Sequence, residues 1–443
     1  ERMGTRSRRH AESSESYSLP VMEWLTIALA CMLCVALVFF FSGCWDARDI
    51  DNTGFVMGMG VDESDDGRIT VWVQMALPSS APEAEGGFPS WLGSATGSTI
   101  MEAMSVLKAK SAKTLFRGHV RVLVIGETIA RGDLRPILDF MARDSQFRYN
   151  SWVVVTSDPV SKVFEVEAEQ QSMASAYIND LMRHATLSSI APQSRFRDLM
   201  STWEEPGDQP ILARVGLVKA ESPEEGGGQG QKQGSTEGQG VEEGDGQGKP
   251  AEDDLAIGGC AALHGDSMVG WLTPVETAMV LMARNKLKEY SFIHEVAGRD
   301  GGRVGVQVLH SRAELKLPPR GEMTGTSLPG AEVRIKVTGR VYIREVTSEE
   351  QFVALEATRD LNRGLSEQIE REMKSLIEAA QTRLGSDILG IGEAVRRQVA
   401  YETWERELAP RWHDLFKTLR IVPEVNLRVE RQGTTMTSPR PRA

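Results

Sequence analysis

The stretch HVRVLVIG at residues 119–126 is followed by LRPILDFMAR at 134–143 and by WVVVT at 152–156. The first and third runs are rich in β-branched residues, which favour strands, and the middle run has the pattern of a helix. A strand, a helix and a strand in succession form a βαβ unit, whose two strands lie parallel in one sheet. The sequence therefore predicts a mixed α/β fold with a sheet that is at least locally parallel.

The residues before this unit predict a hairpin. Residues 55–61 and 68–77 are strand-like, and the polar stretch Asp62–Gly67 joins them. This stretch imitates the start of a calcium loop, but its twelfth position is Val73 rather than a bidentate Glu. We therefore interpret it as a hairpin turn.

A loop and a helix are predicted to follow the hairpin. Residues 78–97 are rich in Gly, Pro and Ser, which favours a loop. Thr99 and Glu102 have the spacing of a capping box, which predicts a helix that runs to about residue 113.

The acidity of the chain is concentrated in one segment. The 443 residues carry a formal charge of −12, which argues against nucleic acid as the main partner because binding to phosphates requires a basic face. Residues 221–254 hold ten acidic residues and two lysines, a net charge of −8, and this leaves −4 for the rest of the chain. The segment has almost no apolar side chains to offset the entropy of ordering, so we expect a flexible acidic linker.

Two further units are expected after the linker. In residues 255–346, a hairpin precedes a helix that is opened by a capping box of Thr273 and Glu276, and two β-rich runs at 304–317 and 331–346 suggest antiparallel strands. In residues 347–433, apolar residues at spacings of three and four form one stripe of a long helix: Leu361, Leu365, Ile369, Met373, Leu376, Ala380 and Leu384. This stripe is expected to pack on the sheet of its own domain, with a coiled-coil partner as the alternative.

The predicted organisation is thus three α/β domains behind a leader. The domains are 44–220, 255–346 and 347–433, the linker is 221–254, and residues 434–443 form a flexible tail.

The amino-terminal segment predicts export. Four arginines precede an apolar run at residues 24–41, the arrangement of a secretory signal. Phe41-Ser42-Gly43-Cys44 resembles a bacterial lipobox, with Phe41 in place of the usual Leu. We therefore expect residues 1–43 to be a signal peptide and Cys44 to be acylated, with an uncleaved membrane helix as the alternative. Either reading places the remaining chain outside the cytoplasm and at a membrane.

No catalytic, cofactor or metal site stands out in the sequence. The seven histidines are dispersed, without HExxH or any pair at metal-ligand spacing. Gly265-Asp266-Ser267 is expected in a short turn between strands rather than at a nucleophile elbow. Trp404 and Trp412 and the solitary Cys260 are expected to be buried, with a ligand platform as the alternative role of the two tryptophans. The residues predict a protein that is not an enzyme.

Several short motifs, in order along the chain, resemble the Ger(x)C family of spore germination lipoproteins. They are CWDARDI at 44–50, GMGVD at 58–62, FRGH at 116–119, IGE at 125–127, LDFMARD at 138–144, GCAA at 259–262, MVGWL at 268–272 and DILGIGE at 387–393, with Glu276-Thr277, Trp412 and Phe416. The resemblance covers residues 44 to 433. Phe41, the long leader and the acidic insertion depart from the family pattern.

The resemblance implies a role and partners. A Ger(x)C protein is the C subunit of a nutrient germinant receptor in the inner membrane of an endospore, where it works beside two integral-membrane subunits, A and B. The family fold is three α/β domains, and no catalytic residue is known that could be assigned here. We hypothesise an anchored docking element that stabilises the receptor and helps to transmit nutrient binding.

Two other classes of protein are alternatives. A solute-binding lipoprotein would need a ligand cleft, and ligand would raise its melting temperature. A cell-wall hydrolase would need acid and base groups that converge in a cleft.

Overall fold

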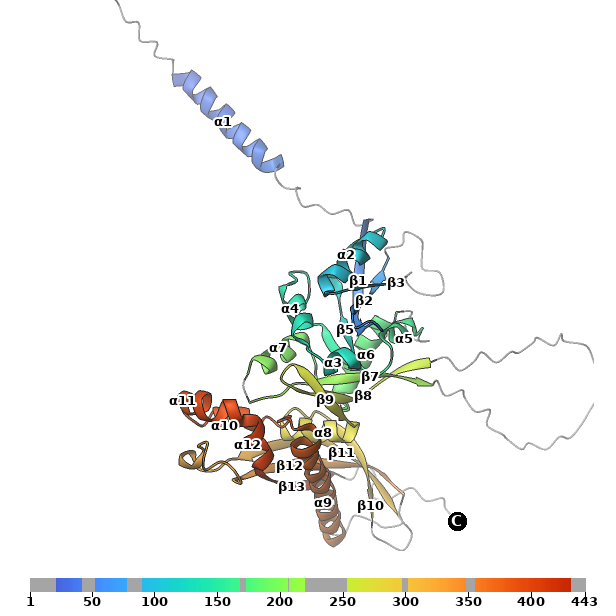
Figure 1. Ribbon diagram of the computed structural model, residues 1–443, viewed down its shortest axis with the longest axis vertical. Coiled ribbons are helices and arrows are strands. Elements are labelled where there is room, and N and C mark those ends of the chain that lie inside the picture. The colour runs from blue at the N-terminus through green and yellow to red at the C-terminus, as the bar shows by residue number, and fades with distance from the viewer. Residues whose placement is uncertain are drawn as a thin grey trace, which may run out of the picture. The chain divides into compact units, whose positions relative to one another are not determined.

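The computed structural model describes residues 21–41, 52–77, 90–167, 173–205, 207–219, 253–296, 302–347 and 355–431 (Figure 1). The chain divides into two compact units, Glu1–Asp51 and Asn52–Ala443. The first unit contains one described helix, α1 (Val21–Phe41), which covers the whole predicted apolar run at residues 24–41. Over the residues whose side chains are described, no helix is both long and apolar enough to cross a membrane.

The second unit contains two sheets. Nine strands of the described residues form the first sheet, in the order β3-β2-β1-β5-β6-β7-β8-β9, with β4 beside β1. Their bounds are β1 Thr53–Glu63, β2 Ile69–Ala76, β3 Ser90–Gly97, β4 Thr114–Phe116, β5 Val122–Gly126, β6 Trp152–Thr156, β7 Ile211–Lys219, β8 Asp253–His264 and β9 Ser267–Leu272. The pairs β1–β5, β5–β6 and β6–β7 are parallel, whereas the pairs at both ends of the sheet are antiparallel.

The predicted βαβ unit is confirmed. Strand β5 pairs with β6 from Val122↔Trp152 to Gly126↔Thr156, and helices α3 (Glu127–Arg131) and α4 (Arg135–Arg143) connect them. Every residue of both strands is buried. Continuous burial is what parallel strands require when helices cover both faces of their sheet.

Helices cover the two faces of the first sheet. On one face, α2 (Ile100–Lys110) and α4 contribute Leu107, Ile137 and Met141 to a core that α7 (Phe196–Glu204) extends. On the other face, α5 (Val160–Glu165) and α6 (Ala174–Leu187) contribute buried residues of a separate core. The first sheet is therefore the middle layer of three.

The second sheet has the order β10-β11-β12-β13. Its strands are β10 Tyr290–Glu295, β11 Arg303–Lys316, β12 Glu332–Val346 and β13 Arg420–Arg431. The predicted antiparallel pair is confirmed as β11 and β12, and β13 joins β12 in parallel. Helix α9 (Leu355–Ala379) and the π-helical turn Ala380–Leu384 carry the predicted apolar stripe, all of which is buried in the core of this sheet. The stripe thus packs within its own domain.

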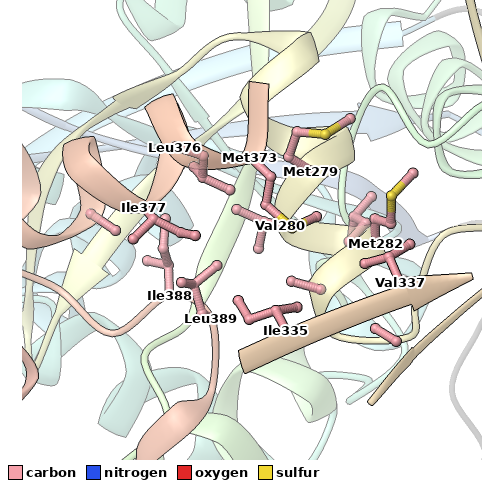
Figure 2. Close-up of a cluster of buried hydrophobic side chains, with 14 of the residues drawn as sticks. Met279, Val280, Met282, Ile335, Val337, Met373, Leu376, Ile377, Ile388 and Leu389 are labelled. Atoms are coloured by element: carbon pink, nitrogen blue, oxygen red, sulfur yellow. The ribbon is translucent and has the colours of Figure 1, made fainter. Parts of the chain in front are cut away.

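Helix α8 (Pro274–Ala283) lies within the core of the second sheet. Figure 2 shows Met279, Val280 and Met282 of this helix beside residues of β12, α9 and the segment 388–389. The predicted capping box forms completely, because the Thr273 hydroxyl accepts the Glu276 N–H and the Glu276 carboxylate accepts the Thr273 N–H. Three short helices, α10 (Ile391–Arg396), α11 (Tyr401–Thr403) and α12 (Trp412–Thr418), complete this half of the molecule.

The structure differs from the sequence interpretation in two places. Residues 90–97 form strand β3 rather than part of a loop, and they pair with β2 from Ile69↔Gly97 to Ala76↔Ser90. The expected middle domain, 255–346, is divided between the sheets, because β8 and β9 extend the first sheet and β10–β12 build the second. The expected boundary at 346 also falls inside a sheet, since β12 pairs with β13.

Candidate functional site

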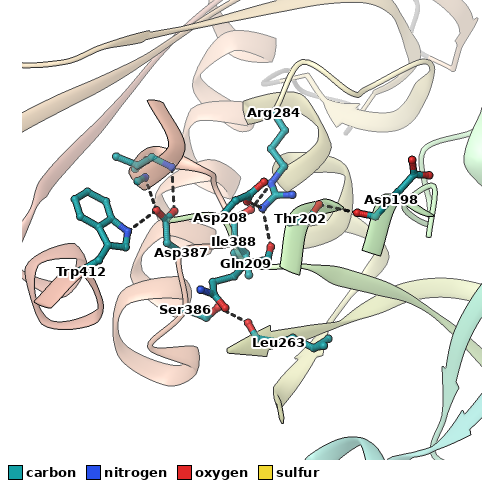
Figure 3. Close-up of polar contacts among 12 residues, drawn as sticks. Asp198, Thr202, Asp208, Gln209, Leu263, Arg284, Ser386, Asp387, Ile388 and Trp412 are labelled. Atoms are coloured by element: carbon teal, nitrogen blue, oxygen red, sulfur yellow. Dashed lines mark hydrogen bonds and ion pairs between the residues drawn. The ribbon is translucent and has the colours of Figure 1, made fainter. Parts of the chain in front are cut away.

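The two sheets meet at a set of buried polar contacts around the segment between α9 and α10. We call the contacts made by Asp208, Arg284, Ser386, Asp387 and Trp412 the joint (Figure 3). The DILGIGE motif supplies its centre. Gly390 adopts a φ of +74°, which favours glycine, and the chain turns there into α10.

Asp387 accepts three hydrogen bonds. Its Oδ1 accepts the Ile391 N–H at 3.1 Å, and its Oδ2 accepts the Gly392 N–H at 2.7 Å and the Trp412 Nε1–H at 2.9 Å. The side chain is buried, and this burial raises the pKa of Asp387 to about 6 despite the three donors. The carboxylate thereby fixes the start of α10 against α12.

Gly392 allows the close approach that these bonds need. A Cβ atom at this position would lie 2.5 Å from Trp412 Nε1 and 2.6 Å from the Gly207 carbonyl oxygen. The Gly207 carbonyl also accepts the Glu393 N–H at 3.0 Å. The lead-in to β7 is thus held directly against the start of α10.

Arg284 connects three segments at the end of α8. Its guanidinium pairs with Asp208, donates from Nε to the Ile388 carbonyl at 2.7 Å and from an Nη atom to the Gln209 carbonyl at 2.8 Å. Both side chains of the pair are largely buried, with 7% and 16% of their side-chain surface exposed. Burial raises the pKa of Asp208, and the guanidinium acts against this shift.

A hydrogen bond from Ser386 directly links the segment between α9 and α10 to the first sheet. Its hydroxyl donates to the Leu263 carbonyl of β8 at 2.5 Å. Ile388 and Leu389 follow Ser386 by two and three residues, and both lie in the core of the second sheet (Figure 2). The joint therefore ties strand β8 of the first sheet to the hydrophobic core of the second.

A cavity of about 390 Å³ adjoins the joint. Residues of the α6–α7 connection, the start of β7 and the end of α8 line it, among them Pro192, Gln193, Pro210, Leu281, Lys286 and Leu287. Arg284 also reaches its wall. The cavity combines apolar walls with both basic side chains and the acidic Asp198, a mixed lining of the kind found in small-molecule sites.

Two histidines meet at the same boundary. His264, at the end of β8, and His413 of α12 have ring centroids 4.3 Å apart, and Lys417 contacts the His413 ring. Burial, followed by the proximity of His413 and Lys417, lowers the pKa of His264. The sequence shows both residues only as dispersed histidines, because 149 positions separate them in the chain.

The structure also places the other residues singled out in the sequence. Trp404 and Trp412 are buried with ring centroids 5.4 Å apart, as predicted for core residues. Cys260 is buried, which raises the pKa of its thiol to about 12. Gly265 and Asp266 form the predicted turn between β8 and β9, Ser267 begins β9, and Asp266 accepts the Trp203 Nε1–H at 3.1 Å.

Cys44 and most of the acidic linker lie outside the described residues, so lipidation stays a prediction. Among the residues that the structure does describe, no three His, Cys, Asp or Glu side chains gather as metal ligands would. Of the residues in the joint, the sequence singled out Trp412 alone, as a residue expected to be buried. Asp387 entered only as part of a family motif, and Asp208 and Arg284 carry no local signal.

Comparison with known proteins matches both halves of the chain to spore germination families. Residues 46–217 match the family described as the spore germination protein N-terminal domain. Residues 258–433 match the family described as spore germination B3/GerAC like, C-terminal.

Individual proteins agree with this match. The chain is 22% identical to spore germination protein KC of Bacillus subtilis (strain 168) over 407 residues, 86% of this chain and 92% of that protein. It is 29% identical to spore germination protein B3 of the same organism over 147 residues, 32% of this chain and 39% of that protein.

A solved structure agrees on the fold. The crystal structure of the GerBC protein superposes with a TM-score of 0.51 at 16% identity, over 86% of this chain and all of that one. This likeness confirms the mixed, multi-domain α/β fold. The two family matches, which together span most of the chain, show that it belongs to the Ger(x)C family of spore germination proteins.

Proposed function

We propose that this chain is the lipid-anchored C subunit of a spore nutrient germinant receptor. The observation that carries the proposal is the ordered match of both germination domains, which begins at residue 46, two residues after Cys44. A cysteine directly before the first matched domain is where a lipoprotein of this family would carry its anchor.

The proposed anchor places the protein on the extracytoplasmic face of a membrane, the spore inner membrane. A single acyl chain binds a membrane only marginally, whereas two or more hold a protein stably. A diacylglyceryl group on the Cys44 sulfur brings two acyl chains and would therefore hold the folded unit at the surface where the integral-membrane A and B subunits lie.

The proposed role is non-catalytic docking and transmission. The joint supports it, because one buried ion pair and several hydrogen bonds connect the two sheets through several chain segments. A partner that binds to one sheet can then change the position of the other sheet, because the contacts between the two sheets are rigid. This rigidity suits a subunit that stabilises a receptor and passes on nutrient binding at another subunit.

Replacing Cys44 by alanine in the sporulating host is expected to abolish the anchor. The variant should lose lipid labelling, leave the membrane fraction and germinate much more slowly on nutrients. Without Cys44 the protein has no attachment point for the acyl chains that bind it stably to the membrane. Metabolic fatty-acid labelling, membrane fractionation and nutrient germination assays measure the three effects.

Cys31 and Cys34 provide the matched control. Both lie in α1 and are exposed there, so Cys31→Ala and Cys34→Ala should keep labelling, retention and germination. Normal behaviour of the Cys44 variant in all three assays would refute both the anchor and the receptor role.

The cavity beside the joint favours one alternative, a membrane-anchored solute-binding lipoprotein. In that case a nutrient would bind to this chain directly, and at a hundred times its Kd it would stabilise the purified full chain by about 2.7 kcal/mol. A thermal-shift screen of amino acids and sugars distinguishes the two roles. The docking role predicts no shift, and a shift that Lys286→Met removes would establish solute binding in the cavity.

A further inference from the structure

The second sheet has one open face. Helix α9 buries alternate residues of β12, including Val333, Ile335 and Val337, in the core. The intervening residues, among them Arg334, Lys336 and Arg340, are exposed on the opposite face. This face is independent of the joint and of the proposed function.

Three strands form a basic depression of about 490 Å³ on the open face. Its outward side chains are His310 and Arg312 of β11, Thr338 and Arg340 of β12, and Asn426 and Arg428 of β13. The concentration of three arginines and a histidine contrasts with a chain whose formal charge is −12.

A bulge in β11 puts the histidine and the first arginine there. The register shifts between Val308 and His310, so that Leu309 is the extra residue. Val304, Val306 and Val308 point inward, and without the shift His310 would do the same. Bulges of this kind redirect side chains and are common near functional sites.

The strand register sets basic side chains side by side. His310 lies opposite Arg340, and Arg340 lies opposite Arg428, in one row across the sheet. In the next row, Arg312, Thr338 and Asn426 are neighbours. Adjacent strands are about 4.8 Å apart, and like charges directly opposite each other destabilise a sheet.

Compensation for this repulsion is incomplete. Arg340 donates to Glu430 at 3.2 Å, and the Tyr342 hydroxyl donates to the same carboxylate at 2.8 Å. Within the described part of the chain, no hydrogen bond or ion pair holds the guanidinium of Arg312 or Arg428. Arg312 is attracted to the nearby carboxylate of Glu314, so of these two cations only Arg428 has no counter-charge among the described residues.

We propose that this depression binds a phosphate group. Arg312, Arg340 and Arg428 would donate to its oxygens, since the planar guanidinium matches oxyanion geometry and forms charge-assisted hydrogen bonds. Three guanidinium groups in the lining of one depression suit a doubly charged phosphate better than a single carboxylate. The Asn426 amide, which also lines the depression, is a further neutral donor.

The test measures the melting temperature of the purified full chain in two arms. The first titrates inorganic phosphate against chloride at constant ionic strength in detergent. The second compares phosphatidylcholine vesicles with and without phosphatidylglycerol. A rise with inorganic phosphate assigns the site to a free phosphate-bearing solute, and a rise with the anionic vesicles alone assigns it to a lipid headgroup.

The double variant Arg312→Gln/Arg428→Gln should weaken the response by about tenfold or more, because hydrogen bonds to charged groups are each worth about 1.5–3 kcal/mol. Its melting temperature in chloride should not fall, since like-charge repulsion is removed. The control Lys316→Gln/Lys336→Gln removes the same charge from the same face outside the depression and should keep the response. No rise in either arm, or an equal loss in the control variant, would overturn the proposal.

Discussion

Asp387→Ala is expected to lower the free energy of unfolding by about 3–5 kcal/mol. The substitution leaves the Ile391 N–H, the Gly392 N–H and the Trp412 Nε1–H without their acceptor in a buried site. An unsatisfied buried donor costs about 1–3 kcal/mol, and the cavity left by the side chain adds to the loss. Chemical denaturation followed by tryptophan fluorescence measures the change.

Asp387→Asn is the matched control for volume. An amide oxygen in the Oδ2 position keeps the bonds from Gly392 and Trp412, while its NH₂ group faces the Ile391 N–H. One donor is then lost rather than three, and the expected cost is about 1–3 kcal/mol. Equal losses for the two variants would show that the hydrogen bonds do not carry the effect of Asp387.

The difference in unfolding free energy between wild type and Asp387→Asn is also expected to depend on pH. Burial raises the pKa of Asp387 to about 6 from 3.8, so the folded state holds a proton in this range that the unfolded state has released. The corresponding contribution to stability is complete below about pH 3.8 and is lost as the pH rises through about 6. Wild type should therefore exceed Asp387→Asn by more at pH 5 than at pH 7.5.

Local patterns predicted the elements whose partners are near in sequence. The strands β5 and β6 and the hairpin of β1 and β2 could be read from the chain because β-branched runs and turn residues specify them directly. The stripe on α9 could be read for the same reason, since helical periodicity is a local property.

Features that depend on distant partners could not be read in this way. Residues 90–97 hold Gly93 and two serines, and they form a strand because β2 supplies the hydrogen bonds at the sheet edge. The sequence of β8 and β9 does not indicate which sheet these strands join. Strand β8 pairs with β7, which lies on the other side of the acidic insertion in the chain.

The joint is non-local in the same sense. Asp208 and Arg284 are 76 positions apart, and charged residues of these types occur throughout the sequence. Burial distinguishes this pair from the exposed ones, and burial is a property of the assembled sheets. Sequence could therefore indicate the family motif around Asp387 but could not show what the motif contacts.

Arg284→Met is expected to cost about 3–5 kcal/mol of unfolding free energy. The change leaves Asp208 buried without its counter-charge and removes the donors to the Ile388 and Gln209 carbonyls. Arg284→Lys should fall between wild type and Arg284→Met, because a single ammonium cannot reproduce the fork that reaches three acceptors. Chemical denaturation of the purified full chain measures both variants.

The double variant Asp208→Leu/Arg284→Met separates the ion pair from the two carbonyl contacts. Removing both charges takes away the uncompensated carboxylate, so the double variant should lose less than the sum of the single losses, by about 1–3 kcal/mol. Additive losses would mean that the two side chains are not coupled.

If Arg284→Met is destabilised and still supports normal nutrient germination while it remains at the membrane, the joint is not needed for transmission. A defect in germination that the double variant partly restores would instead tie receptor function to the rigidity of this contact.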